Sequence, residues 1–291
     1  MSDKPILDKS AVRRSFDRAA DTYDAAAVLQ HEVCRRSLDR LDFIRHRPKL
    51  ILDAGCGTGN AWRGLASRYP GARVIALDLA PGMLQKARAA VPWHQRLLRH
   101  LPSAVCGDLE RLPLKNGCID LVWSNLALQW VNALPQAFAG LRRVLTPGGL
   151  CMFTTFGPDT LKELRAAQAD TDGHVHGSGF IDMHDIGDML VQAGFADPVI
   201  DMETFTLTYD DVRGVMRDLQ AIGARNAALD RPSALSGKAW FAQVERNYEQ
   251  WRRDGRLPAT FEVIYGHAWC PQPRSGPGGR PVIDIKPVRG A

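Results

Sequence analysis

The chain has 291 residues, of which 45% are apolar and 24% are charged, and its net charge at pH 7 is +5. This balance is typical of a folded globular protein, and no apolar run reaches the roughly 18 residues that a membrane span needs. The amino-terminal segment has no apolar core and carries Asp3, Asp8 and Asp17, so we expect neither a secretory signal nor a transit peptide.

The first predicted element is a helical segment over residues 11–43, where apolar residues recur at near-helical spacing without glycine or proline. Strands and helices then alternate, which is typical of βαβ units and a parallel sheet with helices on both faces. The predicted strands are 49–54, 73–79, 104–107, 119–125 and 150–156, and the predicted helices are 60–68, 81–90 and 134–145.

The pattern changes after residue 157. Residues 158–168 and 183–193 are predicted helices, and 199–209 and 260–269 are predicted strands, because they are rich in Thr, Val, Ile and aromatic residues. We therefore expect an amino-terminal helical segment (1–44), a Rossmann-like core (45–209 and 258–270), a helical cap (210–257) inserted between the last two strands, and a flexible Pro- and Gly-rich tail (271–291).

Cysteine and histidine usage indicates no metal site. The six cysteines form no CxxC pair, so we expect a reducing cytoplasm and no structural zinc. His174 and His176 flank Val175 in a loop rich in Gly and Asp, where solvated side chains are the simpler interpretation. The positive net charge favours an acidic partner, whereas the absence of dense basic stripes interleaved with aromatic residues argues against nucleic acid.

The most specific motif joins the first predicted strand to the helix that follows. It reads Asp53-Ala54-Gly55-Cys56-Gly57-Thr58-Gly59, in which glycines allow a tight turn and close approach of a ligand, and the helix N-terminus offers free N–H groups. A dinucleotide fingerprint would need glycine at position 60, where this chain has Asn60. Asp53 suits the ammonium group of an amino-acid-like cofactor.

Two further carboxylates end the next strands. Asp78 ends the second strand, where acidic residues bind ribose hydroxyls in related folds, and Asp108 ends the third strand beside Leu109, where it suits an adenine amino group. Leu79 and Met83 would supply apolar contacts to the adenine ring. Because ligands of open α/β sheets bind at the carboxyl ends of the strands, we expect these residues to share one pocket.

These motifs resemble those of the seven-stranded, class I S-adenosylmethionine-dependent methyltransferases, over roughly residues 45–156. The resemblance implies a mostly parallel seven-stranded sheet with one antiparallel strand, for which we expect Thr260–Trp269. It also implies S-adenosylmethionine as methyl donor, bound by the following residues: Gln30, Asp53, Gly55, Cys56, Gly57, Gly59, Asp78, Leu79, Met83, Asp108, Leu109 and Asn125.

Further segments resemble the malonyl-acyl-carrier-protein O-methyltransferase family of biotin synthesis, and together they span nearly the whole chain. They are Ser15–Ala20 with Thr22–Asp24, Ser124–Trp130, Phe153–Phe156, Asp182–Asp185, Ile222–Asn226 and Thr260–Ala268. The resemblance implies methylation of the free carboxylate of a malonyl thioester on acyl carrier protein, with no membrane or nucleic-acid partner. Asn125, Gln129 and Tyr23 are the candidate catalytic residues, because Asn125 and Gln129 follow the fourth strand and Tyr23 lies on the amino-terminal helices with Gln30.

A carboxylate substrate needs no general base, and the sequence contains no nucleophile–base arrangement. Because acyl carrier protein is acidic, we expect basic cap residues to dock it; the candidates are Arg213, Arg217, Arg225, Arg252 and Arg253. Methylation of a small diffusible acid, modification of a protein side chain as in a related arginine-hydroxylating assembly factor, nucleic-acid methylation and a non-enzymatic role remain alternative interpretations at this stage.

Overall fold

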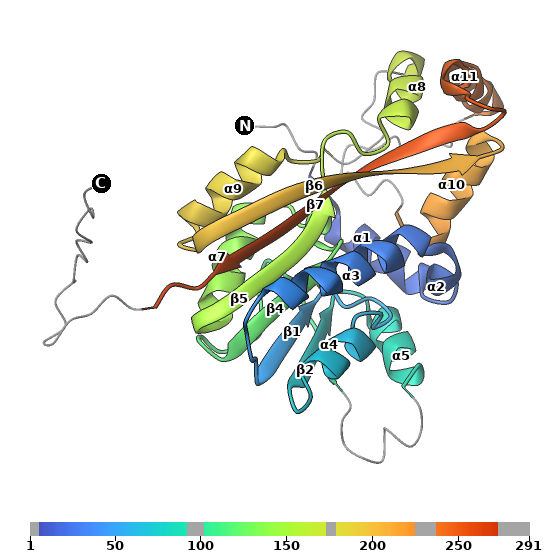
Figure 1. Ribbon diagram of the computed structural model, residues 1–291. Coiled ribbons are helices and arrows are strands. Elements are labelled where there is room, and N and C mark those ends of the chain that lie inside the picture. The colour runs from blue at the N-terminus through green and yellow to red at the C-terminus, as the bar shows by residue number, and fades with distance from the viewer. Residues whose placement is uncertain (1–5, 92–101, 173–178, 225–236, 273–291) are drawn as a thin grey trace, which may run out of the picture.

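The computed structural model describes residues 6–91, 102–172, 179–224 and 237–272, and a seven-stranded sheet forms its centre (Figure 1). The strand order is β3-β2-β1-β4-β5-β7-β6. β7 pairs antiparallel with both of its neighbours, whereas the pairs β3–β2, β2–β1, β1–β4 and β4–β5 are parallel. The predicted α/β fold, including its antiparallel strand at 260–269, is therefore confirmed. The strands are β1 Leu50–Ala54, β2 Arg73–Asp78, β3 Ser103–Cys106, β4 Ile119–Asn125, β5 Leu145–Phe156, β6 Ala196–Tyr209 and β7 Leu257–Trp269.

Helices cover both faces of the sheet (Figure 1). On one face, Phe138 and Leu190 pack against strand residues such as Phe153, and on the other Cys34 and Leu65 pack against the opposite side of β1, β4 and β5. No helix in the described part of the chain is long and apolar enough to cross a membrane. The helices are α1 Lys9–Ala19, α2 Tyr23–Ala26, α3 Val28–Arg40, η1 Leu41–Phe43, α4 Trp62–Arg68, α5 Pro81–Ala89, η2 Leu128–Trp130, α7 Leu134–Val144, α8 Lys162–Asp172, α9 Met183–Gln192, α10 Val212–Ala221, α11 Lys238–Tyr248 and η3 Glu249–Trp251.

The predicted amino-terminal helical segment over residues 11–43 is divided into α1, α2, α3 and η1. α1 ends at Ala19, and Thr22 donates its side-chain hydroxyl to the carbonyl of Ala19 at 3.2 Å and to that of Ala221 at 2.9 Å. Side-chain hydrogen bonds of this kind compete with helical ones, and here they turn the chain toward α10. Ala27, which is fully buried, separates α2 from α3 with φ −81° and ψ 38°. Neither break carries a glycine or proline signal.

Three strands begin at least three residues earlier than predicted. β5 starts at Leu145 because this residue already pairs with Ile119, ahead of an irregularity in the register. β6 and β7 pair over their full lengths, from Ala196 opposite Trp269 to Tyr209 opposite Leu257. Only the second half of β7 pairs with β5, so the other half extends beyond the sheet as a two-stranded ribbon.

The ribbon carries the segment between β6 and β7 past the end of the sheet (Figure 1). There, α10 and α11 form a second apolar cluster with α8 and α3, in which Val215, Tyr248, Leu164 and Val33 are buried. The helix predicted at 158–168 is displaced to 162–172, since Gly157 donates to the carbonyl of Glu262 and the chain turns before α8 begins. This cluster joins residues between β6 and β7 to Leu126, which follows the carboxyl end of β4.

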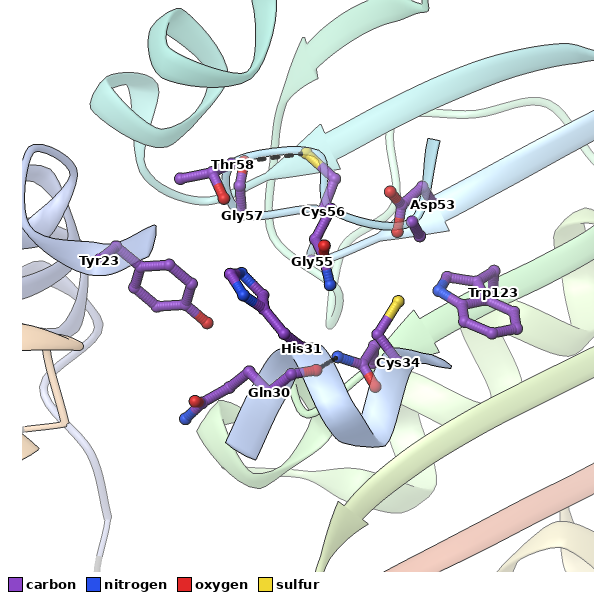
Figure 2. Close-up of a pocket in the computed structure, with 13 residues that line it drawn as sticks. Tyr23, Gln30, His31, Cys34, Asp53, Gly55, Cys56, Gly57, Thr58 and Trp123 are labelled. Atoms are coloured by element: carbon purple, nitrogen blue, oxygen red, sulfur yellow. Dashed lines mark hydrogen bonds between the residues drawn. The ribbon is translucent and has the colours of Figure 1, made fainter. Parts of the chain in front are cut away.

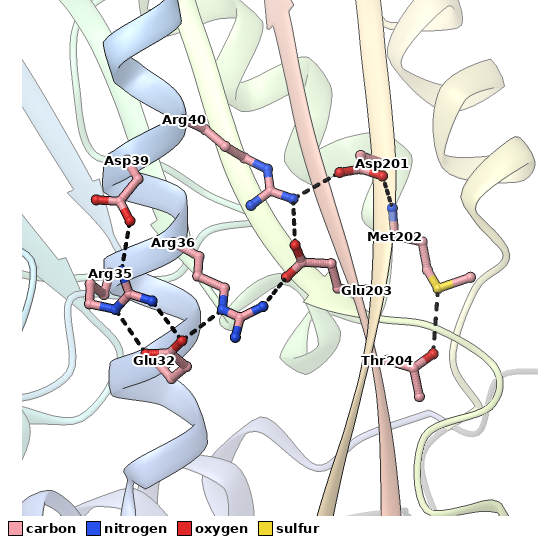
Figure 3. Close-up of polar contacts among 9 residues, drawn as sticks. All are labelled: Glu32, Arg35, Arg36, Asp39, Arg40, Asp201, Met202, Glu203 and Thr204. Atoms are coloured by element: carbon pink, nitrogen blue, oxygen red, sulfur yellow. Dashed lines mark hydrogen bonds and ion pairs between the residues drawn. The ribbon is translucent and has the colours of Figure 1, made fainter.

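Ion pairs connect α3 to the outer strand of the sheet (Figure 3). Arg36 contacts Glu203 at 3.2 Å, and Arg40 contacts Asp201 at 2.8 Å and Glu203 at 3.2 Å. The guanidinium carbon of Arg40 also lies 3.7 Å from the ring centroid of Tyr265 on β7. α3 is therefore attached to both β6 and β7, within the part of these strands that belongs to the sheet.

Candidate active site

The glycine turn after β1 has left-handed backbone at three glycines, whose surroundings differ. Gly55, Gly57 and Gly59 have φ of +79°, +52° and +84°. A Cβ atom at Gly55 would lie 2.3 Å from that of Ala127, and one at Gly59 would lie 2.9 Å from the ring of Trp62. A Cβ at Gly57 would meet no protein atom within 4 Å. Gly55 and Gly59 are therefore needed for packing, whereas Gly57 leaves open space beside the backbone.

Asp78 holds this turn against the end of β2. Its two carboxylate oxygens accept hydrogen bonds from the backbone N–H groups of Gly57 at 2.9 Å and Ala80 at 2.8 Å. Burial raises the pKa of Asp78, and the two backbone donors oppose that effect. The carboxylate thus lies at the point where the glycine turn, β2 and α5 meet.

Asp53 is a buried carboxyl group at the end of β1. It is 2% exposed, and its Oδ2 atom accepts a hydrogen bond from the indole N–H of Trp62 at 2.9 Å. Burial, together with the nearby charge of Asp78, raises its pKa to about 7, although the Trp62 hydrogen bond acts in the opposite direction. A carboxyl group with this pKa becomes ionised most easily when a cation binds beside it.

Two adjacent pockets open around these acids. The first, here named the Asp53 pocket, is enclosed by Asp53, His31, Cys34 and Thr58; Figure 2 shows Tyr23 and His31 facing the Gly55–Thr58 turn. The second, the Asp78 pocket, contains Asp78 together with Leu79, Met83, Asp108 and Leu109. Tyr23, Gly55, Gly57 and Asn125 line both pockets. The structure therefore brings the three strand-end acids to one continuous site.

Most of the predicted site residues lie at this site, but two do not. Gly59 lines neither pocket, and its N–H donates to the carbonyl of Cys56 at 2.9 Å. Gln129 is buried, and its side-chain amide donates to the carbonyl of Leu126 at 2.7 Å and accepts from Thr155 at 3.4 Å. Gln129 thus lines neither pocket and lies behind the pocket wall, where it can position other residues.

Asn125, by contrast, lies where both pockets meet. Its amide nitrogen donates to the backbone carbonyl of Gln30 at 3.2 Å, and its amide oxygen accepts from the hydroxyl of Thr154 at 3.0 Å. These contacts connect β4 to α3 and β5 and hold the Asn125 side chain in one orientation. Tyr23 approaches the same place from α2, and burial together with the charge of Asp78 raises the pKa of its hydroxyl above the usual range, so the phenol is neutral.

Sequence reasoning missed several residues of the Asp78 pocket. Lys9 lies 3.1 Å from Asp108 and also contacts Glu110, so Asp108 already has a cationic partner. Phe16 and Trp130 form another part of the wall, with ring centroids 5.1 Å apart at 89°. The spacing of Phe16 and Tyr23 on the amino-terminal helices was a signal for the wall, but nothing local indicated the Lys9–Asp108 pair.

Within the described ranges, no group of three or more His, Cys, Asp or Glu side chains is placed to hold a metal ion, and His174 and His176 lie outside those ranges. All six cysteines are free thiols.

The fold and site define a class of protein. The family description "Methyltransferase domain" matches residues 52–153, which include the glycine turn and all three acids. The solved YcgJ protein of Bacillus subtilis has the same fold, with a TM-score of 0.59 at 14% identity over 82% of this chain and 99% of that one. The chain is thus a methyltransferase of the Rossmann-like α/β class.

Two relatives of high sequence identity identify the family within this class. Malonyl-[acyl-carrier protein] O-methyltransferase of Methylovorus sp. (strain MP688) is 58% identical over 98% of this chain and 97% of that protein. The protein of the same name from Gallionella capsiferriformans (strain ES-2) is 57% identical over 96% of each. The chain belongs to the malonyl-[acyl-carrier protein] O-methyltransferase family, which confirms the family resemblance found in the sequence.

Proposed function

We propose that this chain methylates the free carboxylate of a malonyl group held as a thioester on acyl carrier protein, with S-adenosylmethionine as donor. The product is a methyl ester at the start of pimeloyl and biotin synthesis. The observation that carries the proposal is the meeting of the Asp53 and Asp78 pockets at Tyr23, Gly57 and Asn125 in a chain of this family. We place the reaction in the cytoplasm, since six free thiols suit a reducing compartment.

The described residues fit S-adenosylmethionine. The buried Asp53 carboxyl is complementary to the ammonium group of the amino-acid end, and Asp78 is placed to accept from ribose hydroxyls. Leu79 and Met83 offer apolar surface to the adenine ring in the same pocket. The open space beside Gly57, where a Cβ would meet nothing, allows the ligand to pass from one pocket to the other.

The chain's own residues have little acid–base chemistry to perform. Bound S-adenosylmethionine supplies a methyl group on a positively charged sulfur, which leaves as a neutral thioether. A malonyl carboxylate is ionised at neutral pH, so one C–O bond forms, one C–S bond breaks and no proton moves. Asn125 and the neutral Tyr23 hydroxyl therefore orient the carboxylate beside the methyl group, and alignment of this kind contributes roughly 7–11 kcal/mol in well-oriented systems.

The structure narrows the basic residues that can dock an acidic carrier. Arg213 contacts Glu245 at 3.3 Å, Arg252 is paired with Glu249 at 2.6 Å, and Arg253 donates to backbone carbonyls. Arg225 lies outside the described residues. Of the four that the structure describes, Arg217 alone is exposed without an ion pair or hydrogen bond to another described residue.

Arg217 shares a surface hollow with a second unpaired arginine. The hollow lies between α1 and α10, encloses about 400 Å³, and also contains Arg18, Ser15 and Gln220. Arg18 is likewise exposed and forms no ion pair with a described residue. Two unpaired guanidinium groups in one hollow attract acidic side chains and speed their encounter, so we propose that the carrier docks at Arg18 and Arg217.

The central test is direct. The purified protein is incubated with methyl-labelled S-adenosylmethionine and malonyl-acyl carrier protein, and mass spectrometry of the carrier follows. We expect the malonyl carrier to gain one labelled methyl group, and acetyl carrier, which lacks the free carboxylate, to gain none. Transfer to free malonate at the same kcat/KM as to the carrier would show instead that the substrate is a small acid.

A further inference from the structure

A groove beside the active site has the chemistry of a binding site for a thioester arm. It lies between the start of α3, the end of β6 and α10, and it encloses about 190 Å³. Its walls are mainly apolar, formed by Val28, Leu29, Leu207, Leu219, Ile222 and Phe261. We refer to it as the α10 groove.

Three polar groups interrupt these apolar walls. The groove is also lined by Thr208, Tyr209 and Asp218. Burial raises the pKa of Tyr209 above its usual range, and the nearby negative charge of Asp218 is a second, smaller cause. The groove thus offers a neutral phenol, a hydroxyl and a carboxylate among methyl and methylene groups. An arm in which short methylene runs alternate with amides needs this mixture, because each buried amide requires a hydrogen-bond partner.

The groove continues into the active site through one residue. Gln30 lines both the α10 groove and the Asp53 pocket, and its backbone carbonyl accepts the hydrogen bond from Asn125. The Gln30 side chain is 8% exposed, and its amide forms no hydrogen bond with another described residue. The amide is therefore free to hydrogen-bond a ligand at the place where the α10 groove meets the Asp53 pocket.

We propose that the α10 groove binds the pantetheine arm that carries the malonyl thioester, and that the Gln30 amide contacts the malonyl group where the groove meets the Asp53 pocket. This inference rests on the proposed function. In it, the apolar walls bind the methylene groups, Tyr209 and Asp218 bind the amides, and the malonyl carboxylate emerges beside Tyr23 and Asn125.

The test fills the groove from its rim. Val28 is 64% exposed and Leu219 is only partly buried, so Val28→Trp and Leu219→Trp place an indole in the groove with little cost to the core. Val191→Trp, on α9 and 57% exposed in the wild type, is the matched control. The substrates are malonyl-acyl carrier protein, malonyl-pantetheine and malonyl methylthioester, which lacks the arm.

We expect both groove variants to raise KM for the two arm-bearing substrates by about tenfold. The kcat/KM for malonyl methylthioester and the Kd for S-adenosylmethionine should stay within about twofold of the wild type, as should every constant of Val191→Trp. Unchanged KM values for the arm-bearing substrates in variants that bind S-adenosylmethionine normally would reject the groove. Absence of transfer by the wild type to any malonyl thioester would reject the proposed function instead.

Gln30 has its own test. Gln30→Glu places a negative charge toward the malonyl carboxylate, so we expect kcat/KM to fall at least tenfold for all three malonyl thioesters, since like charges repel strongly at a buried site. Gln30→Met keeps the length of the side chain without its amide and should reduce kcat/KM less. Equal activity of all three proteins would show that the amide does not reach the substrate.

Discussion

The indole N–H of Trp62 lies 2.9 Å from Asp53 Oδ2, and this hydrogen bond opposes the effect of burial on the carboxyl group. Burial nevertheless raises the pKa of Asp53 to about 7, so a large fraction of the free protein is protonated there at neutral pH. An ammonium group binds the ionised form. The affinity for the methyl donor should therefore depend on pH near neutrality.

We expect the Kd for S-adenosylmethionine to rise as the pH falls below about 7, approaching a tenfold rise per pH unit. Titration calorimetry between pH 6 and pH 8.5 measures this dependence. Trp62→Phe removes the opposing hydrogen bond and should move the midpoint to higher pH, and Asp53→Asn should bind weakly at every pH. A Kd that is constant over this range in the wild type would show that Asp53 does not bind the ammonium group.

The same carboxyl group should make the fold less stable as the pH rises. The pKa of Asp53 is higher in the folded protein than its ordinary value of 3.8, so the folded state binds more protons than the unfolded state between these values. Stability is therefore highest below about pH 4 for this group and falls as the pH rises through about 7. At pH 8 the loss is on the order of 4 kcal/mol.

Asp53→Asn keeps an acceptor for Trp62 and removes the charge, so we expect a higher free energy of unfolding than in the wild type at pH 8. Urea denaturation at pH 5 and pH 8 provides the measurement, and the difference between the two proteins should shrink at the lower pH. If the variant is less stable than the wild type at pH 8, the buried charge is compensated by contacts other than Trp62.

Gly55 and Gly57 form a matched pair. A methyl group at Gly55 would lie 2.3 Å from the Cβ atom of Ala127, so Gly55→Ala should lower the free energy of unfolding by about 3 kcal/mol or more. The methyl group of Gly57→Ala would meet no protein atom within 4 Å. The substitution should lower the free energy of unfolding by only about 1 kcal/mol, because alanine is strained in the left-handed backbone conformation. Its methyl group fills the space left for the ligand, so we expect a folded protein whose Kd for S-adenosylmethionine rises at least tenfold, measured by thermal unfolding and calorimetry.

Arg18 and Arg217 should act on the carrier and not on the donor. We expect Arg18→Glu and Arg217→Glu each to raise KM for malonyl-acyl carrier protein about tenfold and to weaken its salt dependence. The Kd for S-adenosylmethionine should not change. Arg73→Glu is the control, because it makes the same change in charge at the amino end of β2, whereas Asp78 lies at the carboxyl end of that strand. Equal effects of all three substitutions would point to net charge alone.

Arg40 and Arg35 test the attachment of α3. Arg40 reaches Asp201, Glu203 and the ring of Tyr265, whereas Arg35 contacts Glu32 and Asp39 of its own helix. Arg40→Met should lower the free energy of unfolding by about 1–2 kcal/mol, and Arg35→Met should lower it by clearly less, because exposed ion pairs are screened by solvent. Equal losses in urea denaturation would mean that the contacts to β6 and β7 add nothing.

The glycine turn and the strand-end acids were predictable because strand ends and helix starts are local features. Asp53, Asp78 and Asp108 each follow a short apolar run, and parallel strands bring such ends to one edge. The positions of Gly59 and Gln129 behind the pocket wall were not predictable, since the direction of a side chain depends on tertiary packing.

The same reason applies to the residues that the sequence did not indicate. Lys9 and Phe16 line the Asp78 pocket from α1, which ends at Ala19. Shortly after this end, Thr22 donates a hydrogen bond to Ala221, far along the chain. The α10 groove likewise joins α3, β6 and α10, so no single stretch of sequence contains its pattern. Contacts between distant segments decide both features.

α3 has one side on the ligand pockets and another on the sheet margin. Gln30 and Cys34 line the Asp53 pocket, while Arg36 and Arg40, within about three helical turns of Gln30, bind the carboxylates of β6. A helix is stiff over such a length. Contacts between the methyl donor and the pocket side of α3 should therefore also restrain the side of α3 that binds β6. Amide protons of β6, on the far margin of the sheet, should consequently exchange with deuterated solvent more slowly once the donor is bound.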